Sequence, residues 1–153
     1  MITDVEKTIR EYIKDVIHLS LATVKDGIPW VSELHFVYDD ALHLYFRSSA
    51  NRRHSKEIAE NSSVAGNIVK EHKNGEAVRG IYFEGNAEQL VDVDQAHPAY
   101  IEYCKRFGTT PIILDDAKSP DGHKFYKISV KKFYVFDSIE STPSQKYELD
   151  WMR

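Results

Sequence analysis

The 153-residue sequence lacks the features on which several common classes of protein depend. It has one cysteine, Cys104, which excludes an intrachain disulfide framework and a metal site built from several thiolates. No apolar run reaches membrane-spanning length, and residues 1–10 are polar, unlike a signal peptide. We therefore expect a cytoplasmic protein with no membrane partner.

The charge balance is also unremarkable, because 20 basic and 24 acidic residues leave a formal net charge of -4. Such a chain is not built to coat nucleic acid, although a local basic cluster can still bind one phosphate group. Hydrophobic residues make up 42% of the chain and aromatic residues 12%, which is typical of a globular protein. The length predicts one domain over residues 1–153, with 138–153 as a short C-terminal tail.

Apolar and polar residues alternate over much of the chain, which is the period of half-buried strands. We predict six strands, with a bulge in the fifth near Leu90 and a kink in the last at Lys131-Lys132; they span 19–24, 30–38, 42–48, 64–70, 78–91 and 126–135. Short turns between them favour antiparallel pairing. This pattern predicts a mainly β protein built as a small, closed or nearly closed barrel, with ligands bound outside the barrel or between subunits.

Helical periods occur outside the strands. Thr3 and Glu6 form a capping-box pattern that opens a helix reaching about Ile17. A second helix begins after Asp94 or His97 and ends at Gly108, and residues 109–122 are predicted as a loop.

A short third helix is predicted at 55–60, and its start is basic rather than acidic. Asn51 is a good N-cap, yet Arg52, Arg53 and His54 follow it. Positive charge at the positive end of a helix dipole is unfavourable unless an anion binds there. Together with Ser48 and Ser49, these side chains would form a phosphate cradle, while a solvated basic turn remains the alternative.

The order of these elements resembles the pyridoxamine 5'-phosphate oxidase-like FMN-binding split-barrel family over residues 5–137. The small uncharacterised bacterial members share the Val64-Ala65-Gly66 and Arg79-Gly80-x-x-Phe83-x-Gly85 strands. The resemblance implies a six-stranded antiparallel split β-barrel with peripheral helices. It also implies a homodimer with FMN in a groove at the subunit interface.

The resemblance carries a set of cofactor contacts onto this chain. They lie along the second strand, at the end of the third, at the basic helix start and in the fifth strand: Ser32, Glu33, Leu34, His35, Arg47, Ser48, Ser49, Arg52, Arg53, His54 and Gly80. His54 stands near a position where the family usually has lysine or arginine, which weakens the expected phosphate contact near neutral pH.

The implied activity is that of a flavin-dependent oxidoreductase acting on an unknown small molecule or electron donor. Residues 138–153 contain no Arg-x-His pair of the kind that holds the substrate phosphate in pyridoxamine 5'-phosphate oxidases proper, which argues against that substrate. A non-catalytic flavin or haem carrier, or a sensor, is the alternative. Trp151-Met152-Arg153 can cover a flavin or fray, and fraying is the commoner fate of a terminus.

Other residues have competing interpretations. His35 and His43 are expected on neighbouring strands and could ligate haem, whereas no histidine spacing predicts a metal site. Glu33 and Glu84 suit either acid–base catalysis or cross-strand ion pairs. Tyr82 suits a dimer interface or a flavin edge. A barrel that binds single-stranded nucleic acid is disfavoured by the acidic charge.

Overall fold

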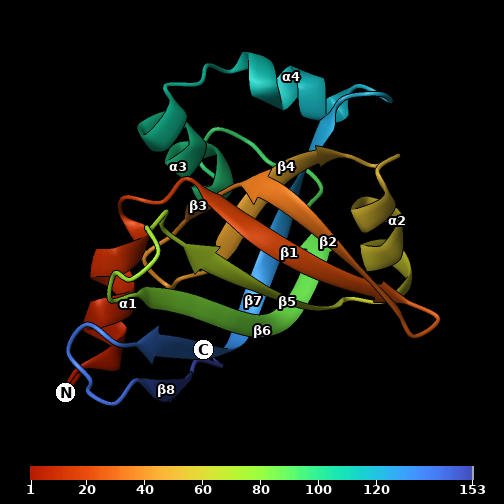
Figure 1. Ribbon diagram of the computed structural model, residues 1–153. Helices are drawn as coiled ribbons and strands as arrows, with labels where there is room; N and C mark the ends of the chain where they lie inside the picture. Colours follow the sequence, from red (N-terminus) through yellow and green to blue (C-terminus); the bar gives the residue numbers. More distant parts are fainter. Residues whose placement is uncertain (153) are drawn as a thin grey trace.

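The computed structural model describes residues 1–152 and shows a strongly curled antiparallel sheet with helices at its periphery (Figure 1). The elements of this part of the chain, in order, are α1 (Val5–Ile13), β1 (His18–Lys25), β2 (Ile28–His35), β3 (Val37–Tyr38), β4 (Leu44–Ser49), α2 (Arg53–Glu60), β5 (Ser63–Val69), β6 (Arg79–Gln89), α3 (Pro98–Phe107), α4 (Ile112–Lys118), β7 (His123–Asp137) and β8 (Gln145–Asp150). The predicted barrel architecture is confirmed. The eight strands are the six predicted ones, with the second divided into β2 and β3, and β8 in addition.

The strands follow the order β2-β1-β5-β6-β7-β4-β3, with every pair antiparallel. Strands β2 and β3 are therefore the two edges of the sheet although they are consecutive in sequence. We call the space between β2 and β4 the seam. Strand β7 is long enough to pair with β4 along its first part and with β8 along its last part.

A β-bulge in β7 lets this long strand keep its apolar residues inside the barrel. Gly85 pairs with Val130 and Glu84 with Lys132, so Lys131 is the extra residue. The β7 residues that fill the barrel have even numbers before the bulge and odd numbers after it: Tyr126, Ile128, Val130, then Phe133 and Val135. The predicted kink at Lys131-Lys132 is thus confirmed, whereas the bulge predicted near Leu90 is wrong. Gly85 is needed here because an added Cβ would collide with the backbone of Ser129.

Two apolar clusters stabilise the fold. The larger fills the barrel and includes the fully buried Phe46, Phe83 and Phe133. The smaller lies between the outer face of β3, β4 and β7 and the two helices α3 and α4, where Tyr45 and Phe125 are buried. The second cluster explains why the predicted loop 109–122 is wrong. Helix α4 lies within this range and covers the outer face with its buried residues Ile113 and Leu114.

The ends of α1 differ from prediction, whereas those of α3 agree with it. Asp4, not Thr3, caps α1 by accepting a hydrogen bond from the Lys7 amide at 3.0 Å, and the helix ends at Ile13. For α3 the structure selects His97, whose Nδ1 accepts from the Ala99 amide at 3.0 Å, and Gly108 ends the helix in the left-handed conformation. Candidate N-cap residues differ little in the free energy they contribute, so the tertiary structure decides which of them caps the helix.

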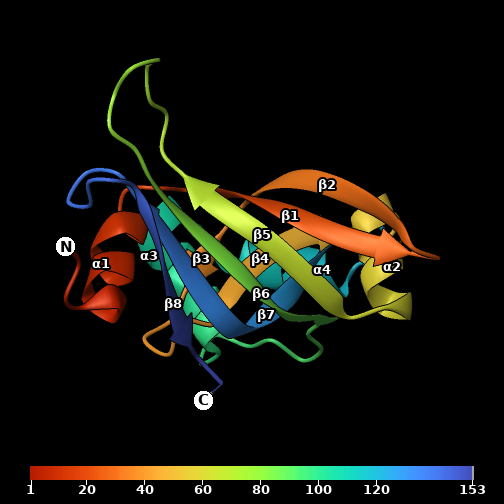
Figure 2. The ribbon, with the colours of Figure 1, turned by 60° about the horizontal axis from the view of Figure 1, so that its bottom comes forward.

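The C-terminal segment is ordered, so the predicted frayed end is wrong over its described part. Strand β8 pairs with β7 and lies beside it in both views (Figures 1 and 2). After β8, the indole of Trp151 is 2% exposed, packs on the ring of Phe133 and donates from Nε1 to the Ala41 carbonyl at 2.7 Å. Arg153 lies outside the described residues. Within those residues, no helix has the length and apolar character needed to cross a bilayer.

Candidate functional site

A groove of about 490 Å³ lies at the seam, lined by His18, Glu33, Leu34, His35 and Arg47. Strand β2 supplies Glu33, Leu34 and His35, three of the residues that the family resemblance implies. His18 is the cross-strand partner of His35, and Ser20 donates a hydrogen bond to Glu33 at 2.8 Å. The groove therefore offers imidazole and carboxylate groups beside an apolar wall.

Arg47 on β4 forms the opposite side of the groove. Its Nη2 lies 2.7 Å from the Asp116 carboxylate, and the guanidinium packs over the ring of Phe125. Its Nε is buried and has no hydrogen-bond partner within the described residues. A buried donor without an acceptor costs stability, so this atom marks a place where a ligand acceptor would be favourable.

His54 joins the two edges of the seam from inside α2. Its Nδ1 lies 3.1 Å from the Ser32 hydroxyl on β2, and its Nε2 lies 2.7 Å from the Ser48 hydroxyl on β4. Burial lowers the pKa of His54, and the positive charge of Arg52 lowers it further. Near neutral pH this imidazole is therefore uncharged, and it positions the two serines instead of binding an anion through charge.

The start of α2 has no side-chain cap. The N-cap residue is Arg52, not the predicted Asn51, and the first turn contains no acidic residue. Asn51 instead donates its backbone amide to the Ser49 hydroxyl at 3.2 Å. The free amides of an uncapped helix start, with Arg52 and Arg53 beside them, are suited to an anion.

Arg53 is the one of these two arginines that is held in place. Its Nε donates to Glu57 at 2.8 Å, and its guanidinium lies 4.1 Å from the ring centre of Trp30. Glu57 is itself buried and accepts from Thr23 at 3.2 Å, and the bond from Arg53 lowers its pKa. The Nη groups of Arg53 donate to no described residue, so they can bind an anion without rearrangement.

The predicted residues thus gather in two adjoining places, with one exception. Ser32, Ser48, Ser49, Arg52, Arg53 and His54 surround the start of α2, while the rest of the set lies in the groove, apart from Gly80. Gly80 lies on β6, three strands from β2, and pairs with Val69 and Phe136.

The predicted placement of His35 and His43 on neighbouring strands is wrong. His35 lines the groove, whereas His43 lines a different cavity, because β2 and β4 are not paired in the sheet. Of the two roles predicted for Glu33 and Glu84, the cross-strand role is confirmed for Glu84, which is the partner of Lys132 and accepts from the Tyr134 hydroxyl at 2.8 Å. Glu33 lies opposite Ser20, so the two carboxylates do not form an acid–base pair.

Sequence reasoning missed His18 and Trp30. The two-residue turn at Asp26-Gly27 fixes the register of β1 and β2, and that register already pairs His18 with His35. No sequence signal placed Trp30 beneath Arg53, since α2 meets β2 only through the tertiary fold.

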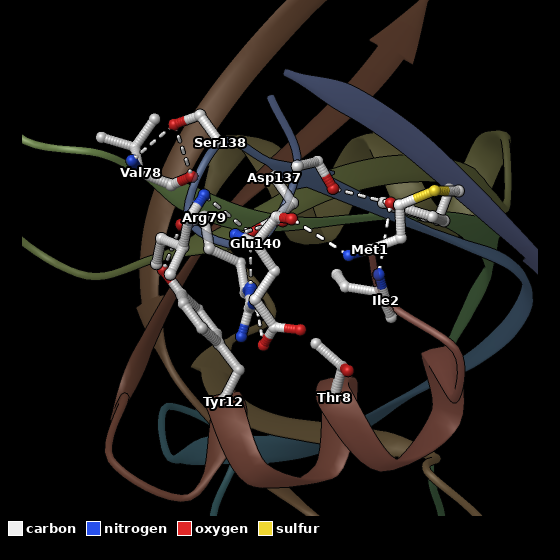
Figure 3. Close-up of polar contacts among 12 residues, drawn as sticks. Met1, Ile2, Thr8, Tyr12, Val78, Arg79, Asp137, Ser138 and Glu140 are labelled. Atoms are coloured by element: carbon white, nitrogen blue, oxygen red, sulfur yellow. Dashed lines mark hydrogen bonds and ion pairs between the residues drawn. The ribbon is translucent and has the colours of Figure 1, made fainter. Parts of the chain in front are cut away.

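Arg79, the first residue of the β6 motif, has a structural role (Figure 3). Its guanidinium contacts Asp137 at 2.9 Å and Glu140 at 3.1 Å, and its carbonyl accepts from the Tyr12 hydroxyl at 2.8 Å. The N-terminal ammonium of Met1 donates to the Glu140 carbonyl at 3.1 Å. These contacts join α1 to the end of β7 and leave the Arg79 charge compensated.

Residues 1–152 contain no group of three or more histidine, cysteine, aspartate or glutamate side chains arranged to hold a metal ion. The sequence model of the pyridoxamine 5'-phosphate oxidase family matches residues 5–137. The chain belongs to this family.

Individual relatives of this family are distant in sequence. A UPF0306 protein of Pasteurella multocida (strain Pm70) is 28% identical over 97 residues, which cover 61% of this chain and 65% of that protein, slightly under two thirds. The haem storage protein HutZ of Vibrio cholerae is 21% identical with a TM-score of 0.69, covering 88% of this chain and 95% of that one. An FAD-binding protein of Mesorhizobium loti is 21% identical with a TM-score of 0.62, covering 85% and 90%. At these identities the two structures show a shared fold.

Proposed function

We propose that the protein binds FMN at the seam and acts as a flavin-dependent oxidoreductase on a small molecule. The observation that supports this most directly is the buried Arg47 Nε, which lacks an acceptor in the described chain and belongs to a side chain that lines the groove. Ser32, next to the groove residue Glu33 on β2, contacts His54 in the uncapped, basic first turn of α2. A ring system with hydrogen-bond acceptors and a phosphate tail matches both parts.

The phosphate would be held at the start of α2. Arg52 and Arg53 would supply positive charge. The backbone amides of α2 and the hydroxyls of Ser48 and Ser49 would supply hydrogen bonds. His54 would act indirectly by orienting the Ser48 hydroxyl, with which it shares its Nε2 hydrogen bond.

The flavin ring would lie along β2, beside Glu33, Leu34 and His35, with Arg47 Nε as a donor to it. When bound, a flavin supplies hydride acceptance and donation at its ring, so the protein needs no nucleophile of its own. The chain's contribution is to bind and orient the ring, exclude water on the Leu34 side and select the reaction partner.

We further propose a homodimer, as in the family to which the chain belongs. Exposed apolar side chains on the outer face of the sheet support this, among them Val31 at 62% and Tyr82 at 38% exposure. In a dimer of this kind Gly80 of one copy would approach the flavin of the other, which would explain its distance from the groove within one chain.

The test is a visible absorption spectrum and a gel-filtration profile of the purified protein after FMN is added and the excess removed. Shifted flavin bands in a dimeric fraction, followed by turnover with NADH or NADPH and an electron acceptor, are expected. Flavin retention without reduction by either nucleotide would support the carrier function instead, and a protein that retains no FMN would contradict both.

Arg53→Ala is the sharpest variant for the phosphate assignment. We expect it to weaken FMN binding by about 2 kcal/mol, or roughly 30-fold, the scale of a lost charge-assisted hydrogen bond. Lys105→Ala, on the exposed side of α3, is the matched control and should bind FMN as the unchanged protein does. Equal FMN affinity in the two variants would refute the assignment.

Haem binding is the second candidate, favoured by one observation. His18 and His35 are cross-strand partners in the same groove, so their imidazoles are the two available iron ligands there. A Soret band that is lost in His35→Ala but kept in His43→Ala would support it, because His43 lines another cavity.

A further inference from the structure

A second cavity, remote from the seam, lies where the bulge of β7 meets the end of the chain. It has a volume of about 380 Å³, and its walls include His43, Asn86, Ser129, Lys131, Trp151 and Met152. We call it the His43 pocket. None of these residues belongs to the proposed flavin site, and the volume falls within the usual range for small-molecule sites.

One ring nitrogen of His43 is bonded to the carboxylate of Asp39. His43 Nδ1 lies 2.9 Å from Asp39 Oδ2, and the same oxygen accepts from the Tyr45 hydroxyl at 2.8 Å. The His43 amide donates to Asp39 Oδ1 at 3.0 Å. Because the carboxylate accepts the Nδ1 proton, Nε2 is the ring nitrogen left for a ligand, and no described residue is bonded to it.

Other polar groups are brought beside this imidazole by the sheet register. Asn86 on β6 and Ser129 on β7 are cross-strand partners, and Ser129 follows Ile128, the partner of Leu44, which is next to His43. Lys131 is the bulge residue, and bulges redirect side chains in this way. Within the described chain Lys131 forms no ion pair, whereas Lys132 contacts Glu148 at 2.7 Å and Asp150 at 3.8 Å.

The sign of charge in this pocket is distinctive. The walls of the His43 pocket contain no carboxylate, although the protein as a whole is acidic. Four other cavities of the described chain, the groove at the seam among them, each have at least one, namely Glu11, Asp26, Asp92 and Glu33. A cavity with one unpaired ammonium group and two further side chains that can donate hydrogen bonds, Asn86 and Ser129, selects an anion.

The remaining wall is apolar, and the part that Trp151 forms is preorganised. The Trp151 amide donates to the Lys131 carbonyl at 2.8 Å, which ties the chain end to the bulge, and the indole is fixed by Ala41 and Phe133. Met152 adds a flexible thioether, 77% of whose residue surface is exposed. A single lysine matches one negative charge better than two, so a carboxylate attached to a hydrocarbon or aryl group fits better than a phosphate.

We propose that the His43 pocket is a binding site for a small organic carboxylate, with its charge at Lys131 and its apolar part against Trp151 and Met152. Ser129 and Asn86 would donate hydrogen bonds to the carboxylate, and the imidazolium form of His43, with both ring nitrogens protonated, would add one from Nε2. The site does not depend on flavin binding at the seam.

Benzoate is the probe, and two-dimensional NMR of the intact protein is the measurement. Saturable shifts at Asn86, Ser129 and the Trp151 indole are expected, and Lys131→Ala should raise the dissociation constant about tenfold. Lys73→Ala, in the exposed turn between β5 and β6, is the matched control and should leave it unchanged. Lys131 is exposed and its side chain makes no ion pair within residues 1–152, so the variant should fold.

Three outcomes would overturn the proposal. The first is the absence of saturable shifts at these residues. The second is equal or tighter binding of benzyl alcohol or inorganic phosphate, which would mean that the pocket does not select a singly charged organic anion. The third is displacement of benzoate by FMN, which would mean that both bind in one place.

Discussion

His54 and His43 occupy two differently built sites in one barrel. His54 is 7% exposed, has serine hydroxyls at both ring nitrogens and no bonded carboxylate. His43 is about a quarter exposed, has a carboxylate at Nδ1 and no partner at Nε2 within the described chain. The first imidazole is satisfied by the protein and holds other residues in place, whereas the second is satisfied on one side only and faces a cavity.

A structural histidine is thus distinguished from one that can bind a ligand less by its burial than by whether its second ring nitrogen, here Nε2, has a partner within the protein. Both residues follow serine-, aspartate- or arginine-rich turns in sequence, and neither turn reveals the difference.

Removing the wall of the His43 pocket should have the largest effect on stability. Trp151→Ala would delete a buried indole and its hydrogen bond to Ala41, and we expect a loss of about 3–5 kcal/mol of unfolding free energy. Urea denaturation measures it. Trp30→Ala is the control, since Trp30 is 41% exposed, and it should lose much less. Similar losses in the two variants would mean that the C-terminal end does not pack as described.

Removing the two imidazoles should separate their roles. His54→Ala would leave buried Ser48 without its partner across the seam, and we expect a loss of about 2–3 kcal/mol. His43→Ala should cost less, about 1 kcal/mol, because Asp39 keeps the Tyr45 hydroxyl as a donor. Urea denaturation of both variants at neutral pH provides the measurement, and the reverse order would contradict the comparison.

The smallest expected effect is a pH dependence at the seam. Burial, together with the charge of Arg52, lowers the pKa of His54 in the folded protein. The unfolded chain therefore binds the proton more readily, and stability is full above the unfolded pKa of about 6.5 and falls as the pH decreases below it. His54→Gln, which keeps two hydrogen-bonding groups but does not titrate, should show a smaller loss between about pH 7.5 and 5.5. Identical pH profiles would contradict this assignment.

Asp39 also makes the stability of the folded protein fall as the pH decreases, but in a lower pH range than His54. Burial opposes its ionisation, but the hydrogen bonds from His43 and Tyr45 outweigh it and lower the pKa of Asp39. Its contribution to stability is present above the unfolded pKa of about 3.9 and is lost as the pH falls further. The two histidine sites therefore weaken in different pH ranges.

Much of the barrel was predictable because it depends on local periodicity. The alternating strands, the turn at Asp26-Gly27, the Gly108 stop and the kink at Lys131-Lys132 are all visible in sequence. The failures share a cause: α4, the cap at Asp4 and strand β8 depend on surfaces that other segments provide. Trp151 has no local signal, since its partners Ala41 and Phe133 are distant in sequence.

For the candidate sites, the division between what the sequence predicts and what only the fold decides is sharper. Residue types and spacing predicted a basic helix start beside two serines, because charge and capping are local properties. Only the tertiary structure decided that His54 lies between Ser32 and Ser48, that Arg47 Nε lacks an acceptor within residues 1–152, and that the two predicted histidines occupy separate cavities. The physical reason is that hydrogen-bond satisfaction and burial depend on which strands become neighbours. That choice is made by packing the whole sheet, in which β2 and β4 lie on either side of the seam without pairing with each other.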